Sequence, residues 1–171
     1  MTTEPERRTP YTDAHYGAGA LFLATEIPSD TNSPLLPEKP ALPAGLAITR
    51  RVRYPVRATG AAAVQARTVA RPALRLILGA GDEAERLSRR IETCLAELVA
   101  LAYTTTDDDM LLCSVWTDDR HVFLSVEHDR PLPTRPDSTT VGLSVVKTIT
   151  DDYGTHRTDN GYETWAALQR H

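Results

Sequence analysis

The sequence predicts an α+β fold, a two-layer sandwich in which a mixed, mostly antiparallel sheet is covered on one face by helices. Segments with the two-residue period of strands and segments with the helical period alternate along the chain. Their order is strand, helix, helix, strand, strand, helix, strand, strand. In each of the two pairs of consecutive strands, a short turn joins the two strands. With 171 residues, of which 41% are hydrophobic and 25% charged, the chain suits one globular domain with a core.

The N-terminal part of the chain differs in composition from the rest. Residues 1–45 hold seven of the twelve prolines and show no sustained hydrophobic period. They are predicted to form a disordered or loosely docked tail, and residues 46–171 the folded domain. Within the tail, GALFLATEI (19–27) is apolar enough to dock as a strand or short helix; the alternative is an unstructured patch.

The first two elements of the domain are predicted to be an edge strand and a helix. In residues 51–57, Val52, Tyr54 and Val56 alternate with arginines, which is the period of a half-buried strand. Pro55 cannot donate a hydrogen bond to a neighbour, so the strand is expected at a sheet edge. Residues 60–78 then predict a helix that Pro72 kinks or splits, and GAG at 79–81 ends it.

A second helix and a hairpin follow. Residues 82–103 carry apolar side chains at helical spacing, namely Leu87, Ile91, Cys94, Leu95, Leu98 and Val99, so one face should be buried. MLLCSVW (110–116) and HVFLSVE (121–127) are predicted strands, and TDDR between them is a short turn.

The C-terminal third predicts a helix and a second hairpin. TVGLSVVKTITDDYG (140–154) is an amphipathic helix that begins at a Val-Gly step and should stop at Gly154, with Val146 and Tyr153 in its apolar stripe. Its N-terminus can receive an anion, or Thr139 or Thr140 can cap it. Strands are expected near 154–158 and at 162–169, around an Asp-Asn-Gly turn.

Composition limits the classes of function. The net charge of −4 argues against general polyanion binding, although residues 46–75 hold seven arginines and no acid. Cys94 and Cys113 are too few for a disulfide framework or a zinc site. No signal-peptide pattern and no apolar run of membrane-spanning length occurs, so a cytoplasmic protein is expected.

Four motifs in this order resemble those of the Bergerat-fold (GHKL) ATP-binding domain, which is a histidine-kinase-like ATPase fold. They are ELVALA (97–102), VEHDRPLP (126–133), TVGL (140–143) and ETWAAL (163–168). The small anti-sigma factor serine kinases are the most similar subfamily. The resemblance covers about the last 120 residues and implies the fold already predicted from periodicity.

The resemblance assigns roles to individual residues. Glu97 matches the glutamate that positions the attacking water or hydroxyl, and Asp129 the aspartate that binds adenine. The Mg²⁺-binding asparagine of the family corresponds to Leu101, which offers no oxygen ligand. Of the lid glycines Gly142 is retained, but Thr140 replaces the other. The nucleotide site is therefore expected to be degenerate: it binds ATP or ADP weakly, and no metal ligand is predicted.

The expected function is that of a bacterial regulator resembling anti-sigma factors, a pseudokinase that acts by protein binding. A sigma factor or an anti-anti-sigma-type protein is the expected partner, and a homodimer is compatible with the family. Arg67, Arg71 and Arg75 lie at i, i+4 and i+8 and form one helical ridge, which is the predicted partner surface.

Alternatives remain for each of these sites. An active ATP-dependent serine/threonine kinase would need residues 107–109, three aspartates, to replace the metal ligand; the alternative is a solvated loop. A nucleic-acid-binding regulator would use the same arginine ridge, which the net acidity makes less favourable. Glu97 can equally be an exposed helix acid, and Asp129 a turn cap.

Overall fold

The computed structural model describes residues 36–39, 50–133 and 140–170, and all of them belong to one unit that spans residues 32–171. The elements are β1 (Arg50–Arg57), α2 (Ala62–Leu78), α3 (Asp82–Tyr103), β2 (Met110–Thr117), β3 (His121–His128), α4 (Thr140–Ile149), β4 (Asp152–Thr158) and β5 (Gly161–Gln169). This is the predicted order of strands and helices. The segment 19–27, for which docking was considered, lies outside the described residues.

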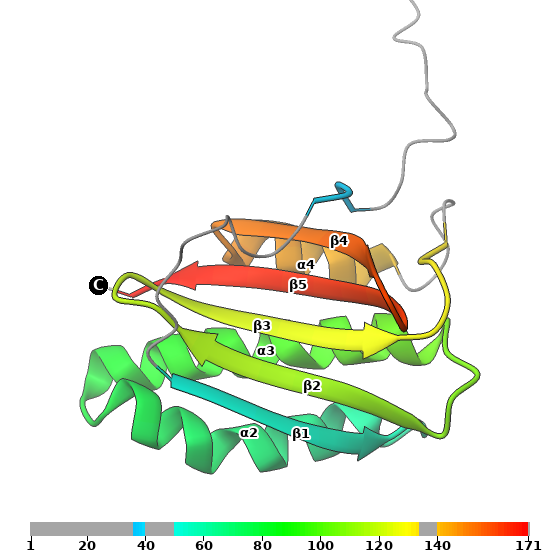
Figure 1. Ribbon diagram of the computed structural model, residues 1–171. Coiled ribbons are helices and arrows are strands. Elements are labelled where there is room, and N and C mark those ends of the chain that lie inside the picture. The colour runs from blue at the N-terminus through cyan, green and yellow to red at the C-terminus, as the bar shows by residue number, and fades with distance from the viewer. Residues whose placement is uncertain (1–35, 40–49, 134–139, 171) are drawn as a thin grey trace, which may run out of the picture. The chain divides into compact units, whose positions relative to one another are not determined.

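The strands form one five-stranded sheet with the order β1-β2-β3-β5-β4, and each neighbouring pair is antiparallel. A parallel bridge between Glu38 and Thr155 adds residues 36–39 beside β4. Figure 1 shows the three helices together on one face of this sheet. The predicted two-layer α+β sandwich is confirmed, and β1 lies at the sheet edge as Pro55 required.

The core lies between the helices and one face of the sheet. Strand residues alternate in direction, so Val52, Tyr54 and Val56 of β1 turn toward the helices while Arg51 and Arg53 point away. The α3 stripe predicted from the sequence is buried there, and it includes Cys94, Leu95 and Leu98 among others. Burial raises the pKa of both cysteine thiols to about 12, which keeps them protonated and unreactive.

Of the two outcomes predicted for Pro72, a kink or a split of the helix, the split does not occur. The helix continues from Ala62 to Leu78 with Pro72 inside it. Proline removes one backbone hydrogen bond, but Ala66 and Ala70 before it and Leu74 and Ile77 after it are buried in the same core. Packing on both sides of the proline therefore keeps the helix continuous. Gly79, with φ of 82°, ends it as predicted.

Helix α4 ends earlier than predicted. It stops at Ile149, and Gly154 lies inside strand β4 rather than at the end of the helix. The side chain and the N–H of Thr150 both bond the Val146 carbonyl, which closes the last turn. The N–H of Asp151 then donates to the carbonyl of Ala167 on β5 at 2.9 Å. Pairing with the sheet thus begins before the helical pattern of the sequence runs out.

The sheet face opposite the helices also holds buried side chains. Trp116, Phe123, Trp165 and Ala167 form a cluster in which no member is more than 5% exposed. The rings of Trp116 and Phe123 stack with centroids 5.5 Å apart. Strands β2, β3 and β5 thus bury side chains on both faces, and small polar residues such as Ser114, Ser125 and Thr164 are buried among the apolar ones. None of the described helices has the length and hydropathy needed to cross a membrane.

Candidate functional site

Helices α3 and α4 bring two of the predicted site residues together. Glu97 lies half-buried on α3, and Gly142 lies in the first turn of α4. A Cβ atom at Gly142 would overlap the carboxylate of Glu97, so the absence of a side chain permits this close approach. Glu97 and Gly142 are therefore neighbours across the contact between α3 and α4.

The position expected for a metal ligand is dry and apolar. Leu101 follows Glu97 by one helical turn and is 3% exposed. It forms a cluster with Leu143 of α4 and Leu36, and the partly buried Leu132 and Tyr153 pack against them. We call these five residues the leucine cluster. Among the described residues no group of three His, Cys, Asp or Glu side chains could hold a metal ion.

Asp129 is engaged in a loop contact. Its carboxylate accepts a hydrogen bond from the Thr106 hydroxyl at 2.6 Å and another from the backbone N–H of Asp107 at 3.1 Å. The next residue, Arg130, forms an ion pair with the Asp107 side chain. Asp129 thus caps the loop between α3 and β2, as its alternative interpretation held. Asp107, Asp108 and Asp109 are all exposed, and the Asp107 side chain joins this loop network through Arg130.

A buried histidine precedes Asp129. His128 is 5% exposed, and its Nδ1 lies 2.6 Å from the carbonyl oxygen of Arg130. A carbonyl can only accept, so Nδ1 carries the proton and Nε2 accepts from the Thr164 hydroxyl at 2.8 Å. Burial lowers the pKa of His128 from its ordinary value of 6.5, although the Arg130 carbonyl opposes the shift. The neutral imidazole therefore ties the end of β3 to β5.

Residues 36–39 lie against β4 and close the leucine cluster. The N–H of Thr155 donates to the Pro37 carbonyl at 2.9 Å, and the N–H of Lys39 donates to the Thr155 carbonyl at 2.8 Å. Leu36 is 1% exposed, although the sequence placed it in the tail. This role of Leu36 was not predicted from the sequence. The signal for it is the Leu-Leu-Pro stretch, which is apolar between the polar residues 29–33 and 38–39.

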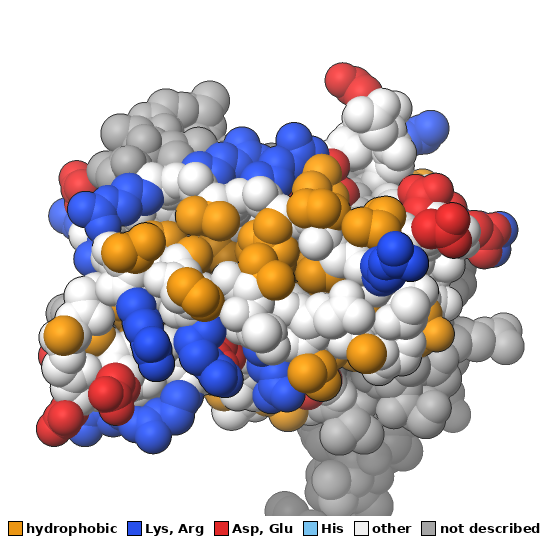
Figure 2. Space-filling model, turned by 90° about the horizontal axis from the view of Figure 1, so that it is seen from below, with side chains coloured by type: hydrophobic (Ala, Val, Ile, Leu, Met, Phe, Trp, Pro, Cys, Tyr) orange, Lys and Arg blue, Asp and Glu red, His pale blue; other side chains and the backbone are white. Residues whose placement is uncertain are grey.

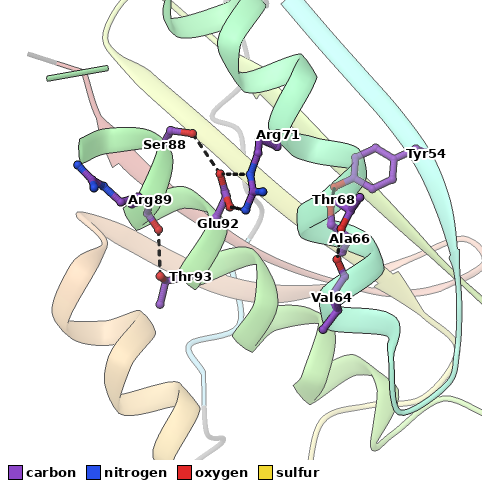
Figure 3. A network of polar contacts seen from close by, with 9 residues as sticks. All are labelled: Tyr54, Val64, Ala66, Thr68, Arg71, Ser88, Arg89, Glu92 and Thr93. Carbon is purple, nitrogen blue, oxygen red and sulfur yellow. Dashed lines mark hydrogen bonds and ion pairs between the residues drawn. The ribbon is translucent and has the colours of Figure 1, made fainter. Parts of the chain in front are cut away.

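The other side of α3 carries a groove toward α2. This concave region has a volume of about 260 Å³, and its lining residues include Arg71, Arg75, Ser88, Arg89 and Glu92. Figure 3 shows Arg71 pointing from α2 toward Glu92 on α3, and the two side chains share contacts at 2.7 and 3.2 Å. The Ser88 hydroxyl donates to the same carboxylate at 3.4 Å.

The predicted arginine ridge is thus divided by its contacts. Arg71 forms an ion pair with Glu92, whose side chain is 13% exposed. One of the three positive charges of the ridge is therefore balanced within the chain. Arg75 is exposed and lines the groove. Arg67 is half-buried and is not among the groove residues. All three lie on α2, but they do not form one uniform charged surface.

The outer face of α2 adds apolar side chains to this surface. Val64, Val69 and Leu76 are exposed by 55%, 45% and 78%. Figure 2 shows the molecule from the side where α2 and β1 lie, and hydrophobic side chains form a band there with Lys and Arg along its margins. Such a combination of apolar and basic groups is typical of protein-binding surfaces.

Comparison with known proteins adds no assignment to this geometry. No protein-family model matches the chain, and no curated protein shows significant sequence similarity to it.

Proposed function

We propose that this chain is a regulatory protein that acts by binding another protein, and that its Bergerat-type nucleotide site no longer serves an ATP-dependent reaction. The observation that carries this proposal is the leucine cluster. Leu36, Leu101 and Leu143 meet between the elements that would hold the metal and the phosphates in a family member. Transfer of a phosphoryl group needs a metal ion and charge-stabilising donors, and buried leucines supply neither.

The remaining site residues support the same proposal. Glu97 lies beside Gly142, and among the described residues no group of His, Cys, Asp or Glu side chains could hold a metal ion near this candidate base. Both carboxylate oxygens of Asp129 accept hydrogen bonds from the loop after α3, so adenine would have to compete with Thr106 and Asp107. In this proposal the polar groups expected to bind nucleotide serve internal contacts instead.

The proposed partner surface is the α2 face, with its arginines and its exposed apolar band. A sigma factor or an anti-anti-sigma-type protein is the partner that the family resemblance suggests, in the cytoplasm of a bacterium. An acidic surface on that partner fits the arginines of α2 and β1 by charge complementarity.

Nucleotide titration tests the first half of the proposal. Isothermal titration of the full chain with ATP, with and without Mg²⁺, should show no Mg²⁺-dependent binding. A phosphate-release assay should show no turnover above the protein-free rate. Mg²⁺-dependent ATP hydrolysis, or phosphorylation of a serine on a candidate partner, would contradict the proposal and favour an active kinase.

Charge reversal tests the second half. A panel of sigma factors and anti-anti-sigma-type proteins is co-expressed with the wild-type chain and with the triple variant Arg67→Glu, Arg71→Glu, Arg75→Glu. Binding to the partner that the wild type selects should be lost in this variant. The control carries the same charge change at exposed arginines elsewhere, Arg86→Glu, Arg120→Glu, Arg157→Glu, and should bind normally. Equal binding of both variants would remove the α2 face from the proposal, and salt-sensitive capture of duplex DNA would favour a nucleic-acid ligand.

A further inference from the structure

Residues 36–39 contact β4 in the way that a bound peptide contacts a sheet edge. Thr155 uses both of its backbone groups, since it donates to Pro37 and accepts from Lys39. The resulting bridge between Glu38 and Thr155 is parallel and lies on the free side of the edge strand β4. Addition of an extended segment to an exposed edge is a general mode of peptide recognition, in which backbone bonds give affinity and side-chain sites give specificity.

Two side chains of the segment fit dedicated sites. Leu36 is buried in the leucine cluster, against Leu101 and Leu143. Lys39 forms an ion pair with Asp152 and lies over the Trp165 ring, with Nζ 5.5 Å from the ring centroid. The indole N–H of Trp165 donates to the carbonyl of Lys39 at 2.8 Å. Glu38, between them, is exposed, so the contacts select a leucine at the first position and a cation at the fourth.

The receptor side is shaped for this backbone. Gly154 of β4 lies under the segment, where a Cβ atom would come within 2.9 Å of Lys39 Cγ and 3.0 Å of the Pro37 carbonyl oxygen. It would also lie 3.1 Å from Nε1 of Trp165, so a larger residue would push the segment away from the indole. These contacts come from β4, which supplies Asp152 and Gly154, and from β5, which supplies Trp165. All three residues lie more than 100 residues from the segment in sequence.

We propose that the β4 edge and the leucine cluster form a peptide-recognition site, which holds residues 36–39 intramolecularly and takes a partner's extended Leu-x-x-Lys segment when these residues are displaced. The ligand class is an extended peptide with leucine at the first position and a cation at the fourth. The proposal goes beyond the regulatory assignment and uses the same leucine cluster, but peptide binding at β4 requires neither a nucleotide nor a partner on α2. Residues 36–39 should compete with the partner peptide and thereby regulate its binding, since a tethered segment acts at an effective concentration on the order of millimolar.

The test compares two full-length chains with one labelled peptide. The peptide has the sequence of residues 33–42, SPLLPEKPAL, and carries a fluorophore for anisotropy. Leu36→Asp in the chain should release the internal segment, because a carboxylate cannot enter the leucine cluster. The peptide should bind this variant at least about tenfold more tightly than the wild type, whose site is already filled. Control peptides with Asp at the Leu36 position or Glu at the Lys39 position should bind at least about tenfold more weakly.

An independent readout follows the indole of Trp165. Its N–H resonance in a ¹⁵N–¹H spectrum should shift in the Leu36→Asp chain and return toward the wild-type position when the peptide is added. Absence of peptide binding to a folded Leu36→Asp chain, or equal binding to both chains, would overturn the proposal. A wild-type dimer that becomes a monomer in Leu36→Asp would overturn the intramolecular occupancy, because the segment would then come from a second copy.

A second variant keeps the test valid if Leu36→Asp does not fold. Lys39→Glu reverses an exposed charge next to Asp152 and leaves the leucine cluster intact. It should raise peptide affinity in the same direction. The double change Lys39→Glu with Asp152→Lys should lower the affinity again, to the wild-type level or below, because it restores an internal ion pair and its new lysine repels the lysine of the peptide. Lack of any effect of Lys39→Glu would contradict the cation site.

Discussion

The two sides of helix α3 are filled in opposite ways. Toward α4, Leu101 lies in the dry leucine cluster and Glu97 touches Gly142. Toward α2, Arg71 and Glu92 pair across an open groove of about 260 Å³. One helix therefore supports a closed apolar contact and an open polar one. The difference shows that the side where a nucleotide was expected is filled by internal packing, whereas the other side has charged groups that are exposed to solvent.

The largest effect should come from placing a polar group in the closed side. Leu101→Asn should lower the free energy of unfolding by about 2–4 kcal/mol, because it removes buried methyl groups and leaves an amide in an apolar cluster. The matched control is Leu76→Asn on α2, where the leucine is 78% exposed. It should cost about 0.5 kcal/mol or less, which is a helix-propensity effect. Urea denaturation measures both, and equal losses would show that the leucine cluster is not a buried contact.

An intermediate effect is expected in acid, from His128 at the end of β3. Burial lowers its folded-state pKa below the ordinary value of 6.5. Above pH 6.5 the His128 imidazole is neutral in both the folded and the unfolded chain. As the pH falls through 6.5, the imidazole of the unfolded chain takes up a proton first, so the stability of the fold decreases until the folded-state pKa is reached. Urea denaturation at about pH 8 and about pH 5.5 should show a larger loss for the wild type than for His128→Gln. A wild-type loss no greater than that of the variant would contradict the buried neutral imidazole.

The contact between Glu97 and Gly142 should appear as a coupling between two substitutions. In the wild-type background, Gly142→Ala gains helix propensity but must displace the Glu97 carboxylate, so stability should change little. In a Glu97→Ala background the displacement is absent, and the same change should stabilise the protein by about 1 kcal/mol. A double-mutant cycle by urea denaturation measures this difference. Equal effects in the two backgrounds would show that positions 97 and 142 do not interact energetically.

The smallest effect is expected on the open side of α3. The Arg71 side chain is 56% exposed, so solvent screens its attraction to Glu92. A cycle with Arg71→Ala and Glu92→Ala should give a coupling close to the detection limit, and added salt should reduce it further. A strong, salt-independent coupling would mean that this groove is as closed as the α4 side, and it would remove the contrast between the two sides.

The sequence by itself determined the elements and their order. These elements follow from local patterns: the alternation in β1, the apolar stripe of α3, and the turn residues at 117–120 and 159–161. Each element lies where its pattern predicted it. The roles expected of Glu97, Leu101 and Gly142 came from the family resemblance and not from a local pattern. Local periodicity reports which face of an element is buried, since burial and period are set by the same side chains.

Tertiary structure alone decided how the elements end and what covers the site. The boundary of α4 moved to Ile149 because Asp151 pairs with Ala167, and α2 continued through Pro72 because the core holds both of its halves. The docking of Leu36 on Leu101, and of Lys39 on Trp165 at a separation of 126 residues, leaves no periodic trace in either segment. Such contacts depend on where the sheet order places β4 and on the missing side chain of Gly154. A local pattern cannot encode a pairing between distant segments, because each partner's own period is satisfied with or without the other.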